Sequence, residues 1–131
     1  MSRPDELIKL LKLHPHPEGG YYKEVYRSNE EIRKDHLPER FSSDCAFSTL
    51  ICYLLQNDDF SAFHRIKSDE IWHFYEGMPI NIYILHHLGM LEIKKLGNDP
   101  LKGEAFNCVV PAGLWFAARL ENKNGYALAG C

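Results

Sequence analysis

Alternation of apolar and polar residues runs through most of this chain after its first twenty positions. Short stretches rich in aromatic and β-branched residues recur between turns of glycine, proline, asparagine and aspartate, which is the pattern of β-strands. A polar stretch over residues 29–44 lacks periodicity and predicts a long loop. So many short strands at regular spacing indicate an all-β barrel or sandwich. We expect strands over residues 21–27, 48–55, 60–66, 70–75, 80–87, 90–96, 106–110, 114–120 and 126–131.

Only the N-terminal segment predicts a helix. Ser2 can cap it, and Pro4 suits its first turn. Leu7, Leu10 and Leu11 follow at helical spacing and give the helix one apolar face. The alternating His-Pro run that comes next ends the helix, because proline drives the residue before it towards extended geometry.

Length and composition indicate one domain over residues 1–131. A net charge of −3 and scattered basic residues argue against nucleic-acid binding, which needs clustered positive charge. The longest apolar run, residues 50–55, falls well short of the roughly 18 residues that cross a bilayer, and the charged N-terminus differs from a secretory signal. The four cysteines have no Cys-x-x-Cys spacing, which favours free thiols and a cytoplasmic location.

Two motifs lie within the strand region. The first, His-x-His followed by three or four residues, a Glu, six residues and a Gly, falls on His64, Ile66, Glu70 and Gly77, with Ile66 in place of the second His. The second, Pro-x-Gly-x-x-His, falls on Pro111, Gly113 and Phe116, with Phe116 in place of the His. Both are motifs of the cupin superfamily, which this chain resembles.

Longer runs make the resemblance more specific. Residues 14–22, 68–74 and 110–116 look like the uncharacterised cupin-5 family, and the similarity spans nearly the whole chain. It implies a double-stranded β-helix, the cupin jelly-roll barrel, related in shape to the dTDP-keto-sugar epimerases. It also implies a homodimer, and a further C-terminal strand of the family that residues 1–131 lack.

Strand alternation predicts which side chains share the interior. If His64 points inward, Ile66 on the same strand does too. If Glu70 points inward, Trp72 and Phe74 on its strand do too. The result is a mostly apolar pocket with a few polar groups, as is typical of small-molecule sites. We expect Trp72 either to stack on a ligand or to pack in the core. The predicted ligand-binding residues are Ile66, Trp72, Phe74 and Phe116.

The polar residues of this pocket suit proton transfer. We expect His64 to act as the base, Glu70 as its orienting partner and Tyr53 as a proton donor if its ring faces inward. The alternative is a buried His64–Glu70 pair that only holds two strands together.

A metal site has less support. A cupin metal centre normally uses four ligands, of which this chain keeps His64 and Glu70 only. His73 could complete a two-His-one-carboxylate set, but it lies three residues from Glu70, so a regular strand sends the two side chains to opposite faces. We therefore expect no metal and no other cofactor.

The sequence thus favours a cupin that binds a small molecule, and more specifically a metal-independent isomerase or epimerase of sugar-type carbonyl compounds that uses His64 and Glu70. Two alternatives stay open: a module that binds a small ligand without turning it over, and a metal-dependent cupin oxygenase.

Overall fold

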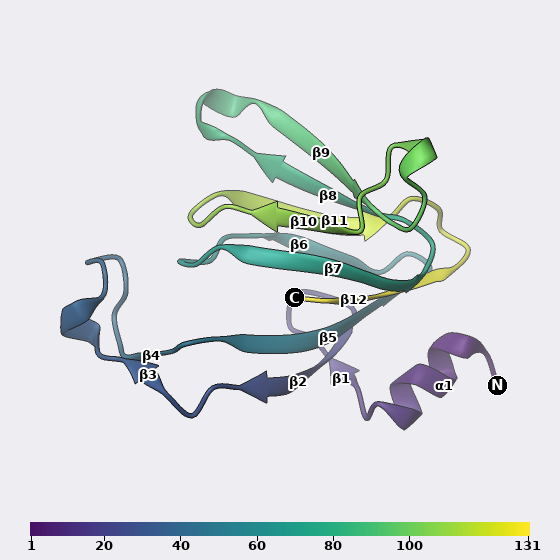
Figure 1. Ribbon diagram of the computed structural model, residues 1–131. Helices are drawn as coiled ribbons and strands as arrows, with labels where there is room; N and C mark the ends of the chain where they lie inside the picture. The colour runs from purple at the N-terminus through teal and green to yellow at the C-terminus, as the bar shows by residue number, and fades with distance from the viewer.

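Two antiparallel sheets face each other in the computed structural model, which describes all 131 residues (Figure 1). The larger sheet has the order β1-β2-β5-β12-β7-β10, the smaller has the order β6-β11-β8-β9, and β3 and β4 pair separately. The strands are β1 (His14–Pro15), β2 (Tyr21–Arg27), β3 (Glu31–Ile32), β4 (Cys45–Ala46), β5 (Thr49–Gln56), β6 (Phe60–His64), β7 (Glu70–Gly77), β8 (Ile80–Leu85), β9 (Leu91–Leu96), β10 (Asn107–Val110), β11 (Trp115–Leu120) and β12 (Tyr126–Gly130).

The chain alternates between the two sheets, so strands distant in sequence become neighbours. The last strand, β12, lies between β5 and β7, and β11 lies between β6 and β8. This arrangement confirms the predicted all-β jelly roll. Hydrogen bonding leaves two separate sheets rather than one closed barrel.

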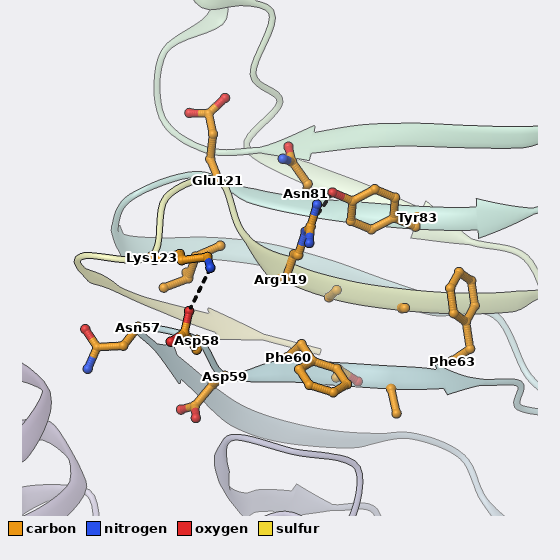
Figure 2. Close-up of a pocket in the computed structure, with 15 residues that line it drawn as sticks. Asn57, Asp58, Asp59, Phe60, Phe63, Asn81, Tyr83, Arg119, Glu121 and Lys123 are labelled. Carbon is orange, nitrogen blue, oxygen red and sulfur yellow. Dashed lines mark hydrogen bonds and ion pairs between the residues drawn. The ribbon is translucent and has the colours of Figure 1, made fainter.

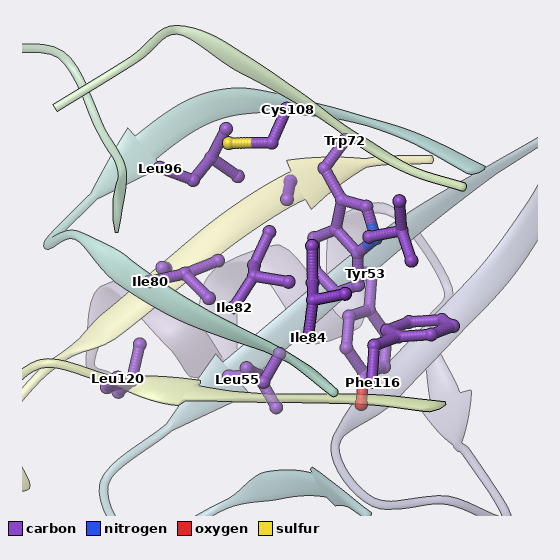
Figure 3. Packing of buried hydrophobic residues seen from close by; sticks show 14 of the residues in the cluster. Tyr53, Leu55, Trp72, Ile80, Ile82, Ile84, Leu96, Cys108, Phe116 and Leu120 are labelled. Carbon is purple, nitrogen blue, oxygen red and sulfur yellow. The ribbon is translucent and has the colours of Figure 1, made fainter. Parts of the chain in front are cut away.

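Alternating side chains of the two sheets fill the space between them. On β8, Ile80, Ile82 and Ile84 are fully buried, whereas Asn81 and Tyr83 between them point to the outer face. The same period of two on the other strands completes a single large apolar cluster. Figure 3 shows its aromatic members, Tyr53, Trp72 and Phe116, gathered at one end.

Helix α1 (Arg3–Leu10) forms where the sequence predicts it. The Ser2 hydroxyl accepts a hydrogen bond from the Asp5 N–H at 3.3 Å and so caps the first turn. Leu7 packs with Leu13, Leu54 and Leu128 against the outer face of the six-stranded sheet. The prediction for the other helical leucines was wrong: Leu10 and Leu11 are exposed, because the helix meets the sheet along the Leu7 side only.

The expected loop over residues 29–44 contains short regular elements. Strand β3 pairs with β4, and the 3-10 helix η1 (Lys34–His36) lies between them. Two more 3-10 helices follow: η2 (His87–Gly89) lies in the turn between β8 and β9, and η3 (Pro100–Lys102) lies in the connection from β9 to β10 of the larger sheet. None of the helices has the length and apolar character that a bilayer crossing requires.

Replacing Ile82 by Ala tests the core. Ile82 is fully buried, so the cavity left by Ile82→Ala should lower the free energy of unfolding by about 2–5 kcal/mol, measured by urea denaturation. Ile71→Ala, at a half-exposed position on the outer face of β7, should cost much less. Equal losses at the two positions would contradict the described core.

Candidate functional site

The polar residues of the first motif lie at one end of the space between the sheets. His64 is the last residue of β6, Glu70 is the first residue of β7, and a short turn connects them. Both side chains are half-buried. They do not form a direct ion pair, but the charge of His64 influences the carboxyl of Glu70. The structure therefore brings the two predicted polar groups into one region without joining them.

A backbone hydrogen bond fixes the orientation of His64. Its Nδ1 lies 2.8 Å from the carbonyl oxygen of Ala62. A carbonyl oxygen only accepts, so Nδ1 must carry a proton, and in the neutral ring Nε2 then holds the lone pair. The imidazole packs on Phe116, with ring centroids 4.4 Å apart. Phe116 is the direct neighbour of His64 across β11 and β6.

Glu70 lies in an environment that disfavours its charge. Burial raises the pKa of its carboxyl, while the Trp72 N–H and the charge of His64 oppose that rise. The Trp72 Nε1–H is itself buried and makes no hydrogen bond of ordinary length and angle, although it lies near enough to favour the ionised carboxylate. Glu70 thus retains its proton to higher pH than an exposed glutamate.

Tyr53 faces inward, as its predicted role requires, and is only 3% exposed. Its hydroxyl donates a hydrogen bond to the carbonyl oxygen of Gly19, and burial raises the pKa of the phenol. The negative charge of Glu70 adds to that rise, which places Tyr53 in the same electrostatic environment. The hydroxyl therefore stays protonated and is already committed to one acceptor.

The predicted ligand-binding residues are all inside, with different degrees of burial. Trp72 and Phe116 are almost completely buried, and Trp72 meets Tyr53 edge-on at 5.8 Å. Ile66 and Phe74 are partly buried and pack against the same cluster. Trp72 therefore takes the core position that was one of its two predicted places, with its indole edge towards Glu70.

His16 is a member of this region that the sequence analysis did not propose. Its ring packs on Tyr22 and Tyr53, with centroid distances of 4.5 and 5.5 Å. Its Nδ1 accepts a hydrogen bond from the Glu18 N–H at 2.9 Å, so in the neutral ring Nε2 carries the proton. Burial lowers the pKa of His16, and the positive charge of His64 lowers it further.

The double glycine after His16 explains this placement. Gly19 and Gly20 both have positive φ angles, +113° and +76°. A Cβ atom at Gly19 would collide with the carbonyl oxygen of Phe60, so only glycine lets this turn lie directly on β6. In the sequence, the Gly19-Gly20 pair was the only signal that this turn could approach another strand closely.

A cysteine thiol completes the inward-facing polar groups. Cys131 follows β12 and packs against the apolar cluster. Burial raises the pKa of this thiol well above its ordinary value, and the nearby charge of Glu70 adds to the effect. Cys131 is therefore a neutral, weakly polar part of the wall.

Comparison with known proteins decides the family. The model of the family described as "Cupin superfamily (DUF985)" matches residues 5–131. This chain belongs to the cupin superfamily. The resemblance noted from the two motifs and the longer runs is confirmed.

Related cupins cover nearly the whole chain. The uncharacterized protein YML079W of Saccharomyces cerevisiae is 30% identical over 98% of this chain and 68% of its own length. The structure of protein SO0799 from Shewanella oneidensis is 33% identical, covers 100% of this chain and 77% of its own, and superposes with a TM-score of 0.87. A hypothetical protein from Leishmania major, 27% identical with a TM-score of 0.83, covers 97% of this chain and 78% of its own.

The residues of this cupin do not fit the usual metal centre of the fold. Ile66 and Phe116 put carbon where two histidine ligands would stand, and His73 lies exposed on the opposite face of β7 from Glu70. No group of three or more histidine, cysteine, aspartate or glutamate side chains is close enough to hold a metal ion. Catalytic metal sites generally need three protein ligands.

Glu70→Gln tests the burial of the carboxyl. Because the folded-state pKa of Glu70 is raised, its contribution to stability is present below its ordinary value of 4.5 and is lost as the pH rises through the folded-state value. Glutamine does not titrate. The free energy of unfolding of Glu70→Gln, relative to that of the unmodified protein, should therefore increase with pH above 4.5, as measured by urea denaturation.

The matched control is Glu39→Gln in the exposed loop before β4. A difference between Glu70→Gln and the unmodified protein that stays constant with pH would show that Glu70 is solvated in the folded state.

Proposed function

We propose that this cupin binds a small carbonyl compound of the sugar type between its sheets and moves a proton on it, as a metal-independent isomerase or epimerase. The observation that carries the proposal is the hydrogen bond from His64 Nδ1 to the Ala62 carbonyl, which leaves the lone pair of Nε2 free in the region of the Glu70 carboxyl. An imidazole near neutrality is well suited to take a proton from the carbon next to a carbonyl.

The proposed step is balanced without a cofactor. His64 Nε2 takes the proton as the C–H bond breaks, and the electron pair moves into an enolate. Return of a proton to the opposite face of the same carbon gives the epimer. Its return to the former carbonyl carbon gives the isomer, provided that the hydroxyl proton on the first carbon passes to the enolate oxygen as the new carbonyl forms. No oxidant or reductant takes part.

Each neighbouring group has a role in this proposal. We assign the orientation of His64 to the Ala62 carbonyl, and we assign the electrostatic stabilisation of the imidazolium that forms to the ionised form of Glu70, which is present above its raised pKa. His16, held as its Nε2–H tautomer, supplies a neutral hydrogen-bond donor. Tyr53 is the proposed proton donor, and its use requires that the hydrogen bond to Gly19 be released.

One observation favours the second candidate, a module that binds a small ligand without turning it over. The Trp72 Nε1–H is a buried donor without a full hydrogen bond, which a ligand acceptor would satisfy. Binding alone would use this donor and would leave His64 without a chemical role.

His64→Gln separates the two candidates. The probe is a panel of ketoses and aldoses, with and without phosphate, in deuterated buffer, and the readout is deuterium incorporation beside the carbonyl by NMR. We expect the unmodified protein to catalyse exchange on at least one sugar, and His64→Gln to lower that rate about 100-fold or more, because a general base contributes that much. The melting temperature should change little.

The control is His73→Gln, the same substitution at an exposed position on the outer face of β7. Exchange that survives in His64→Gln would contradict the role of this residue. Sugar binding without exchange in the unmodified protein would favour the binding module.

A further inference from the structure

Three cationic residues, Arg40, Arg65 and Lys67, form a patch at the turn that joins His64 to Glu70. Arg65 and Lys67 belong to the turn itself. Arg40 reaches it from the loop between β3 and β4, where its Nε donates a hydrogen bond to the carbonyl oxygen of Lys67 at 2.8 Å. Figure 1 shows this loop at the same end of the sheets as the link from β6 to β7. The cationic patch therefore lies beside the proposed site.

No carboxylate neutralises the cationic patch. Other arginines of the chain form ion pairs with aspartate or glutamate, whereas Arg40, Arg65 and Lys67 form none; the paired arginines are Arg3, Arg27 and Arg33. The acidic residues nearest in sequence do not change this. Asp69 accepts a hydrogen bond from the Ala112 N–H at 2.8 Å, and Glu39 is exposed and forms no ion pair. The positive charge of the patch is therefore available to a ligand.

Aromatic rings hold the two guanidinium groups of the patch. The Cζ atom of Arg40 lies 4.7 Å from the centre of the Phe41 ring, and that of Arg65 lies 5.1 Å from the centre of the Trp115 ring. A guanidinium stacked on a ring keeps its N–H edge free, and this planar edge matches the oxygens of a phosphate. Because only Nε of Arg40 is engaged with the turn, its two Nη groups remain as donors.

A groove of about 700 Å³ on the outer face of the smaller sheet is less suited to an anion. Figure 2 shows Lys123 of this groove paired with Asp58. Asp59, Glu121 and Arg119 also line it, so its carboxylates outnumber its cations. An anionic ligand is therefore attracted to the cationic patch rather than to this groove.

We propose that the cationic patch binds the phosphate of a phosphorylated sugar whose carbonyl end lies at His64. This inference rests on the proposed function and names the class of its substrate. Lys67 follows His64 by three residues, so the two Cα atoms are at most about 10 Å apart, and a phosphorylated sugar can extend from one to the other. The patch holds the phosphate by charge and hydrogen bonds, and His64 then faces the carbon that loses its proton.

Binding measurements on the full chain test the proposal. The probes are the phosphorylated sugars of the panel above and their unphosphorylated forms, and the readout is the dissociation constant from isothermal titration calorimetry. We expect at least one phosphorylated sugar to bind about 10-fold or more tightly than its free form, because hydrogen bonds between charged groups are the strong ones. This preference should weaken as the salt concentration rises, because the patch is exposed.

Substitution of the patch should remove the preference for phosphate. The variant that combines Arg40→Gln with Lys67→Gln should bind the phosphorylated sugar about 10-fold or more weakly, and the free sugar as before. The matched control is Arg33→Gln, in the same loop as Arg40 but at an arginine already paired with Asp35. Lys67→Gln alone should show part of the same loss, and it keeps the test valid if the Arg40 change disturbs the loop, because the Lys67 side chain is exposed.

Three results would overturn the proposal. They are the absence of any phosphorylated sugar that binds more tightly than its free form, a preference for phosphate that persists in both patch variants, and an equal loss of that preference in Arg33→Gln. The proposed function fails separately. His64→Gln should keep the preference for the phosphorylated sugar while it loses proton exchange, and tight binding without exchange in the unmodified protein would contradict the isomerase alone.

Discussion

Side chains that point between the two sheets lose contact with water. This loss determines which hydrogen-bond partners and which charge states the polar groups of the site can have. The inward positions of β8, β11 and β12 are filled by carbon, so a polar group placed among them must find a partner or give up its charge. His64 finds the Ala62 carbonyl, and Tyr53 finds Gly19. Glu70 finds no full counter-charge, and burial raises its pKa.

The same constraint explains why two substitutions in the cupin motifs change the chemistry of the site. Ile66 and Phe116 remove the ligands that would draw His64 and Glu70 onto a metal ion. They also make the region drier, which raises the pKa of the Glu70 carboxyl. In our proposal the imidazole then acts as a base rather than as a metal ligand.

Much of the fold could be predicted from the sequence, because alternation with a period of two directly reports burial between sheets. The inward placement of His64 and Glu70 followed from that pattern and from the motifs, whereas the inward orientation of the Tyr53 ring was only a condition of its expected role. The position of His16 could not be predicted in this way. A tight turn that packs against β6 brings it to the site, and the alternation of side chains along a strand does not report such a turn.

The hydrogen bond to the Ala62 carbonyl holds His64 with a free lone pair on Nε2, and the tautomer of the ring shows whether it does. Nitrogen-15 NMR of protein labelled at histidine, with His64→Gln and His16→Gln used for assignment, reports which ring nitrogen carries the proton. When both rings are neutral, we expect opposite tautomers: the proton on Nδ1 in His64 and on Nε2 in His16. A proton on Nε2 of the neutral His64 ring would contradict this assignment, because that nitrogen could then not take a proton from a ligand.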